Sequence, residues 1–255
     1  MIELKTATEI DALRQAGRAA ARTLRVVREH AQVGTTLREL DELARATLAE
    51  AGARPVLLGH HPRWAPTPFP GAIATSVNDA LVHGIPDRTR LSDGDLLGLD
   101  CAAAVHGWVA AAATTFPVGT AQPADTALVE AAEQALADGI AAAQPGARLG
   151  DLSRAIGVLA RSAGCGLPSG LGGHGIGRAL HEAPPVPNDG RPGQGVPLRP
   201  GLVLTVEPVL LAGGADATRT DDDGWTVRTG DGSRAAHVGH TVAITTGGPR
   251  ILTAP

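Results

Sequence analysis

The 255-residue sequence is poor in aromatic residues: it has no tyrosine, two phenylalanines and three tryptophans. The five rings are those of Trp64, Phe69, Trp108, Phe116 and Trp225. The only two cysteines, Cys101 and Cys165, are too few for the disulfide framework of a small secreted protein. A formal net charge of -4 gives no sign of the basic surface by which proteins bind nucleic acids or anionic membranes. These absences favour a small-molecule or peptide ligand.

Membrane and export signals are also lacking. The first residues, Met-Ile-Glu-Leu-Lys-Thr, do not have the basic-then-apolar order of a signal peptide. The most apolar stretch, 96–116, is interrupted by Asp100 and His106, and its small residues predict a buried hairpin rather than a membrane span. We therefore predict a cytoplasmic protein without a membrane anchor.

The pattern of apolar and turn residues predicts two helices followed by strands, and then the same order again. Helical spacing and capping residues predict helices from Thr6 or Thr8 to about His30, after Thr36, over 125–143 and over 149–163. Thr36 and Glu39 have the spacing of a capping box. Runs rich in β-formers predict strands over 72–77, 80–83, 95–101, 108–115, 202–209, 224–229 and 237–245. The order predicts one α+β domain, 1–255, with approximate halves 1–123 and 124–255 related by a pseudo-twofold axis.

The stretch from Gly173 to Glu182 reads Gly-His-Gly-Ile-Gly-Arg-Ala-Leu-His-Glu and places His174 and His181 seven residues apart among three glycines. Glycine lets the backbone approach a ligand closely, so this composition is typical of a site. By itself it could equally be a glycine-rich turn with two solvated histidines. Other motifs must decide between the two interpretations.

Several further motifs occur in a fixed order along the chain. They are Thr75-Ser76-Val77-Asn78, His83-Gly84-Ile85-Pro86, Gly94 to Asp100, Thr205-Val206-Glu207-Pro208, Gly224-Trp225-Thr226 and His240-Thr241. Together with Gly173 to Glu182, they make the whole chain resemble the type I methionine aminopeptidases of the pita-bread (M24) metallopeptidase family. The resemblance implies a pita-bread fold with two pseudo-symmetric αβ halves around a central site.

The same resemblance implies a metal site, but an incomplete one. Family enzymes hold two divalent ions with two aspartates, one histidine and two glutamates. Three of these positions match, at Asp100, His174 and Glu207. The two carboxylates that bridge the ions in the family fall on Ala111 and Gly239 in this sequence.

Losing both bridging carboxylates has a large electrostatic consequence. Two doubly charged ions about 3.5 Å apart repel by on the order of 19 kcal/mol at an effective dielectric constant of about 20. Asp100 and Glu207 can balance one ion at most, for which Mn, Fe, Co or Zn would suit the donors. His237 is a possible surrogate ligand, because it can face the same way as residue 239. We expect it, however, to be a surface histidine.

The remaining family positions concern the substrate. His83 and His181 match the two histidines that contact substrate and assist proton transfer in the family. Phe69, Leu180 and Trp225 fall where the family lines its methionine pocket, although Leu180 replaces the usual aromatic residue. The Pro-rich stretch 61–68 is longer than the family loop, so the shape of the pocket is expected to differ.

Three functions follow as hypotheses. The first is a non-catalytic homologue, a possible pseudoenzyme, that binds a peptide amino terminus or a protein partner. The second is a metal-free or altered hydrolase or lyase that uses His83 and His181. The third is a mononuclear aminopeptidase that releases amino-terminal methionine with one ion held by Asp100, His174 and Glu207.

Overall fold

The computed structural model describes residues 2–254. Along them, two helices are followed by a group of strands, and this order then occurs a second time. The first set comprises α1 (Ala7–His30), α2 (Leu37–Glu50), β1 (Arg54–Pro55), β2 (Ile73–Val77), β3 (Ala80–Val82), β4 (Leu96–Val105) and β5 (Trp108–Pro117). The second comprises α3 (Pro123–Ala142), α4 (Leu149–Ser162), β6 (Gly172–Gly175), β7 (Glu182–Pro187), β8 (Val203–Val206), β9 (Val209–Leu211), β10 (Thr218–Thr220), β11 (Val227–Thr229), β12 (Ala235–His237), β13 (His240–Thr245) and β14 (Gly248–Ile251). The predicted α+β class is confirmed.

Of the two caps that the sequence offers for the first helix, Thr6 and Thr8, the structure uses Thr6, and the cap predicted at Thr36 for α2 is confirmed. The Thr6 hydroxyl accepts a hydrogen bond from the Glu9 amide, and the Glu9 carboxylate accepts one from the Thr6 amide. Thr36 and Glu39 form the same reciprocal pair at the start of α2, as the sequence predicts. Each box satisfies amides that the helix itself leaves without a partner.

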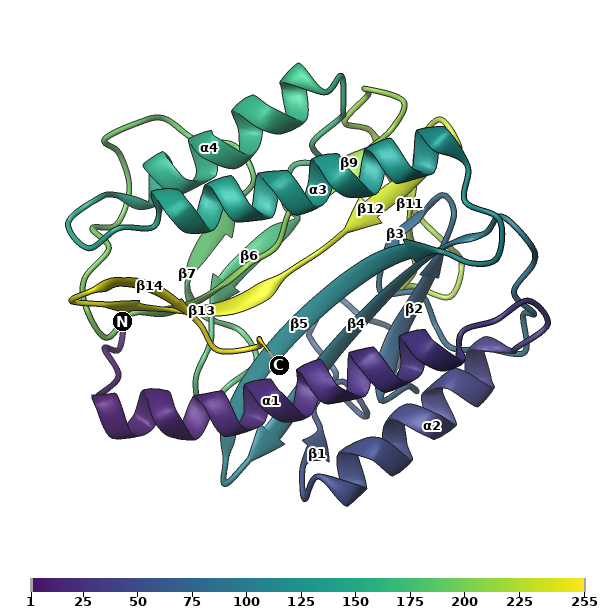
Figure 1. Cartoon of the computed structure of the whole chain (residues 1–255), viewed down its shortest axis with the longest axis horizontal. Coiled ribbons are helices and arrows are strands. Elements are labelled where there is room, and N and C mark those ends of the chain that lie inside the picture. The colour runs from purple at the N-terminus through teal and green to yellow at the C-terminus, as the bar shows by residue number, and fades with distance from the viewer. Residues whose placement is uncertain (1, 255) are drawn as a thin grey trace.

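Two principal sheets lie between the helix pairs. α1 and α2 run along one side of the strands, and α3 and α4 run along the other (Figure 1). In the first sheet β4 pairs with β1, β2 and β5; the second has the order β14-β13-β8-β6-β7. β4 and β5 form the predicted hairpin, buried over most of its length. None of the helices within residues 2–254 has both the length and the apolarity to cross a membrane.

Strand pairing also joins the first part of the chain to the second. The amides of Ala113 and Gly239 each donate to the other residue's carbonyl oxygen at 3.0 Å, which links β5 to the segment before β13. Strand β11 pairs with β3 in a smaller sheet. These contacts bring residues from distant parts of the sequence to one place.

Two predicted strands are interrupted, and this corrects their expected extent. The strand expected over 202–209 divides into β8 and β9 around Glu207 and Pro208, because proline has no amide hydrogen to donate to the ladder. The strand expected over 237–245 divides into β12 and β13, because the Gly239 backbone pairs with Ala113 instead. The strand expected over 224–229 shortens to β11, since Gly224 occupies a turn with φ +73°.

Candidate active site

A cavity of about 740 Å³ opens between the two sheets and collects most of the residues that the sequence singles out. Gly239 is the exception: it lies beside Glu207 and is not part of the cavity wall. The residues predicted from the sequence that line the cavity are Phe69, His83, Asp100, Ala111, His174, Leu180, His181, Glu207, Trp225 and His237.

The β4–β5 register places Asp100 and Ala111 on one face of the first sheet. Asp100 is opposite Ala113, and Ala102 is opposite Ala111. Because side chains two residues apart on a strand share a face, residues 100 and 111 both face the cavity. Asp100 brings a carboxylate to that face, and Ala111 brings only a methyl group.

Glu207 and Gly239 are neighbours across the break between the strands of the second sheet. His240 pairs with Val206 in the β13–β8 ladder, and Gly239 and Glu207 are the next residues beyond that pair. A Cβ atom on Gly239 would lie 2.8 Å from Cγ of Glu207, so the Glu207 side chain occupies part of the space beside residue 239. This corner also has one carboxylate where the family resemblance implies two.

Two imidazoles flank the Glu207 carboxylate. Nε2 of His174 lies 3.9 Å from one oxygen, and Nε2 of His237 lies 3.8 Å from the other. Burial alone would raise the pKa of Glu207, but His237 and His174 outweigh it and bring the pKa to about 2. Glu207 is therefore negatively charged at neutral pH.

His237 is buried, so the expectation of a surface histidine is wrong. It is 6% exposed, because its backbone is bound to the Thr115 hydroxyl of β5, which donates to the His237 carbonyl oxygen and accepts from its amide. Its Nε2 atom has no hydrogen-bond partner within residues 2–254. Burial lowers the pKa of His237, but the adjacent Glu207 and Asp100 raise it above its ordinary value.

Thr115 should therefore contribute measurably to stability. Thr115→Val keeps the shape of the side chain and removes both hydrogen bonds to His237, so the free energy of unfolding in urea should fall by about 1–3 kcal/mol. Thr114→Val is the matched control, because its side chain points to the other face of β5. Equal effects of the two substitutions would contradict this role of Thr115.

Asp100 differs from Glu207 in its electrostatics. Burial raises the pKa of Asp100 to about 6, although His237 and His174 oppose the shift. The two acidic side chains thus face one cavity with different affinities for a proton. A cationic ligand that contacted both carboxylates would offset the free-energy cost of burying their charges.

His83 and His181 both line the cavity. His83 follows β3 with the left-handed backbone angle φ +59°, and its Nδ1 atom is buried without a partner in the described chain. The ring of His181 lies 4.2 Å from that of His174. Desolvation is the main cause that lowers the pKa of both His83 and His181 to about 4. Both are neutral imidazoles at pH 7 and can donate and accept hydrogen bonds.

The predicted pocket residues form an aromatic and aliphatic wall. The ring of Phe69 meets Trp225 edge to face at 5.0 Å, and both side chains are buried. Leu180 lines the same space. The lining residues that the sequence motifs do not identify include His60 and Leu57, which carry no signal in their local sequence. Trp64, one of the few aromatic residues of the chain, also lines the cavity.

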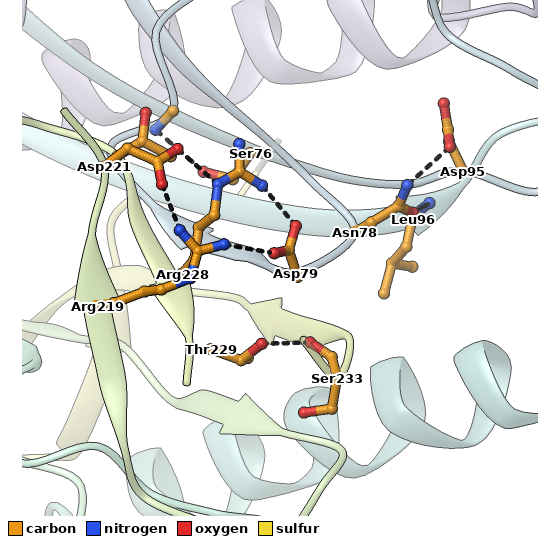
Figure 2. A network of polar contacts seen from close by, with 12 residues as sticks. Ser76, Asn78, Asp79, Asp95, Leu96, Arg219, Asp221, Arg228, Thr229 and Ser233 are labelled. Atoms are coloured by element: carbon orange, nitrogen blue, oxygen red, sulfur yellow. Dashed lines mark hydrogen bonds and ion pairs between the residues drawn. The ribbon is translucent and has the colours of Figure 1, made fainter. Parts of the chain in front are cut away.

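The turn that carries Trp225 is held by a cluster of charges outside the cavity. Figure 2 shows the guanidinium groups of Arg219 and Arg228 between the carboxylates of Asp79 and Asp221. Nε of Arg228 donates to Asp221 at 2.6 Å, and its Nη1 donates to Asp79. The cluster ties the turn after β2 to the segment that precedes Trp225.

Arg228 should matter more to this turn than Arg219. Arg228→Ala removes charge-assisted hydrogen bonds from a side chain that is 29% exposed, so we expect a loss of about 1.5–3 kcal/mol in unfolding free energy. Arg219→Ala affects a 54% exposed side chain and should cost about 1 kcal/mol or less. Thermal and urea unfolding of both variants measure the difference; a larger loss for Arg219→Ala would contradict the assignment.

The donors in the cavity do not fit a pair of divalent ions. Among residues 2–254, no three His, Cys, Asp or Glu side chains converge closely enough to hold an ion. Asp100 and Glu207 provide two carboxylates, and the positions beside them, Ala111 and Gly239, provide no side-chain oxygen. Two divalent metal ions bound at this site would lack the bridging anions that offset the repulsion between them.

Comparison with known proteins identifies relatives over the full length of the chain. The sequence model for Metallopeptidase family M24 matches residues 11–246. Methionine aminopeptidase 1 from Mycobacterium tuberculosis is 45% identical over 260 residues, which cover 99% of this chain and 95% of the relative.

Solved structures agree with this relationship. The crystal structure of methionine aminopeptidase from Thermotoga maritima has a TM-score of 0.95 and 36% sequence identity, and each chain is covered completely. A prolidase from Pyrococcus furiosus, at 21% identity and a TM-score of 0.79, shares the fold over 99% of this chain and 65% of its own. The predicted pita-bread fold is confirmed, and the chain belongs to metallopeptidase family M24 as a homologue of the methionine aminopeptidases.

Proposed function

We propose that the protein binds the amino-terminal residue of peptides in this cavity without the two-ion centre of a normal methionine aminopeptidase. One observation supports this most strongly. The cavity keeps Asp100, Glu207 and the apolar wall, whereas Ala111 and Gly239 carry no bridging carboxylate. The ligand is a short peptide or the exposed amino end of a protein partner, in keeping with relatives named methionine aminopeptidases.

The two carboxylates provide a binding site for the terminal ammonium group. A free peptide amino terminus carries one positive charge near neutral pH. Glu207, whose pKa is about 2, remains ionised and is 16% exposed, so water screens it weakly. Charge-assisted hydrogen bonds from the ammonium to Glu207 and Asp100 would then orient the first residue.

The rest of the cavity suits the remainder of that residue. Phe69, Leu180 and Trp225 offer an apolar wall to its side chain. The neutral imidazoles of His83 and His181 can donate hydrogen bonds to a peptide carbonyl oxygen or accept them from an amide. The site thus recognises a charge at one end and an apolar group at the other.

Isothermal titration calorimetry tests this proposal with the peptide Met-Ala-Ser and its amino-acetylated form. The free peptide should bind with one site per chain, and the acetylated peptide should bind at least about tenfold more weakly, because acetylation removes the charge that Glu207 and Asp100 contact. Equal affinity for the two peptides, or no binding of either, would contradict the proposal.

One observation favours a second candidate, a mononuclear aminopeptidase. The buried Nε2 atom of His237 has no hydrogen-bond partner in the described residues and lies 3.8 Å from Glu207, so a modest movement of the side chains would add an imidazole donor to His174 and Glu207. Metal analysis of protein purified without chelator separates the candidates. One ion per chain that is lost in His237→Gln would favour the second candidate, and a metal-free protein would favour the first.

A further inference from the structure

We propose that Trp64 covers the side chain of the bound amino-terminal residue and selects a long, unbranched apolar side chain there. This inference rests on the proposed function, since it assigns a specificity residue to the same cavity. Trp64 stands on the Pro-rich segment between β1 and β2, and its ring lines the cavity together with Trp225 and His83.

The indole of Trp64 is both exposed and in contact with the cavity wall. Its residue is 60% exposed, the largest value among the exposed large hydrophobic residues of the described chain. Its ring lies 4.9 Å from Trp225 in an edge-on arrangement and 5.9 Å from the stacked ring of His83. One face therefore belongs to the pocket while much of the ring remains in water, where an apolar ligand could cover it.

The segment that carries Trp64 is held in place at both ends. The Gly59 amide donates to the Phe69 carbonyl oxygen, and the Phe69 amide donates to the His60 carbonyl oxygen, both at 2.9 Å. These bonds close the loop between two residues of the cavity wall, His60 and Phe69. Prolines 62, 66, 68 and 70 further limit the conformations of the backbone between them.

A third set of contacts fixes the loop against the segment that carries Trp225. The indole nitrogen of Trp225 donates to the Thr67 carbonyl oxygen at 2.9 Å. Pro66 packs against Gly224, where a Cβ atom would lie 2.3 Å from the proline ring. Trp64 is thus presented to the cavity by an ordered loop, so little conformational entropy would be lost when a ligand covers it.

The neighbouring side chains indicate which ligand side chain fits. Leu57, Phe69, Leu180 and Trp225 are apolar side chains that line the same cavity as Trp64, and Trp225 is in ring contact with it. A flexible, unbranched chain can follow the irregular surface between two indoles, and a thioether makes favourable contacts with aromatic rings. Methionine satisfies both conditions, and a first residue of alanine would leave Trp64 uncovered.

Fluorescence quenching can observe this cover directly, because the chain has three tryptophans and no tyrosine. Trp108 and Trp225 are 5% and 3% exposed, so acrylamide should quench mainly Trp64. Saturating Met-Ala-Ser should reduce the quenching constant by about half or more, whereas Ala-Ala-Ser should change it little. In Trp64→Phe, quenching should be low with or without peptide.

Calorimetry on variants then tests selectivity. Trp64→Ala should weaken Met-Ala-Ser about tenfold and Ala-Ala-Ser less than about twofold, and Trp64→Phe should restore most of the preference. Val158→Ala, at an exposed position of α4 outside the cavity lining, is the matched control and should change neither affinity. Binding of Met-Ala-Ser with unaltered quenching and unaltered selectivity in Trp64→Ala would overturn this inference alone. Failure of the wild-type protein to bind either peptide would overturn the proposed function as well.

Discussion

The double substitution Ala111→Asp with Gly239→Glu should give the protein Met-Ala-Ser cleavage in the presence of Co²⁺ or Mn²⁺, at least about a hundredfold above the wild-type chain. The two new carboxylates would stand beside Asp100 and Glu207 and would supply the bridging anions that the wild-type donor set lacks. Chromatography of the released methionine measures the gain in activity, and metal analysis of the same sample measures the number of ions bound. We expect two ions per chain in the double variant.

The structure can accept both side chains. Residue 111 lines the cavity, so an aspartate there would project into open space. At residue 239 the new Cβ would lie 2.8 Å from Cγ of Glu207 and 3.3 Å from the Val206 carbonyl oxygen, so the Glu207 side chain must shift to admit it. The backbone of Gly239 is not in the left-handed region that favours glycine, so the substitution does not strain it there.

A position-matched control makes this prediction specific. Ala113→Asp with Gly239→Glu adds the same charge on the same face of β5, two residues away from position 111. This variant should remain inactive, as should each single substitution, because one bridge does not offset the repulsion between two ions. Activity in the Ala113→Asp combination would show that added negative charge alone is sufficient and would contradict the account.

Glu207→Gln should weaken binding of Met-Ala-Ser to the wild-type cavity by about a hundredfold, the second large effect that we expect. Glutamine keeps the shape of the side chain and removes the charge that we propose meets the peptide ammonium. Glu207 is 16% exposed and flanked by His174 and His237, so its charge is poorly screened by water.

The acetylated peptide serves as the control for this prediction. Its affinity should be the same for the wild-type protein and Glu207→Gln, because it has no ammonium group to lose. Asp100→Asn should have a smaller effect than Glu207→Gln, since Asp100 gives up its charge more readily, with a pKa of about 6. Unchanged binding of the free peptide in Glu207→Gln would remove Glu207 from the recognition site.

Local signals in the sequence predicted the parts of the fold that depend on local physics. Capping boxes and apolar periodicity located α1 and α2, because those interactions lie within a few residues of each other. The β4–β5 hairpin was equally visible as an apolar run with a central turn. The order of the sequence motifs, through their resemblance to one family, predicted the pita-bread fold, which the comparisons confirm.

The sequence could not predict features that depend on contacts between distant segments. His237 looked like a surface residue because its burial comes from Thr115, which lies more than a hundred residues earlier in the chain. The strand break at Gly239 depends on a distant contact in the same way, since Gly239 pairs with Ala113 of the first sheet. The break at Glu207 has a local cause, Pro208, which the sequence does show. His60 and Trp64 reach the cavity only through the path of the Pro-rich loop.

The central claim is that this cavity binds a peptide amino terminus without a two-ion centre. The most direct measurement is metal analysis and mass spectrometry on one sample of wild-type protein that has been incubated with Met-Ala-Ser and excess Co²⁺ or Mn²⁺ and then separated from unbound ions. The account predicts that the peptide is recovered intact from the protein and that fewer than two ions are present per chain. Two ions per chain together with released methionine would contradict it.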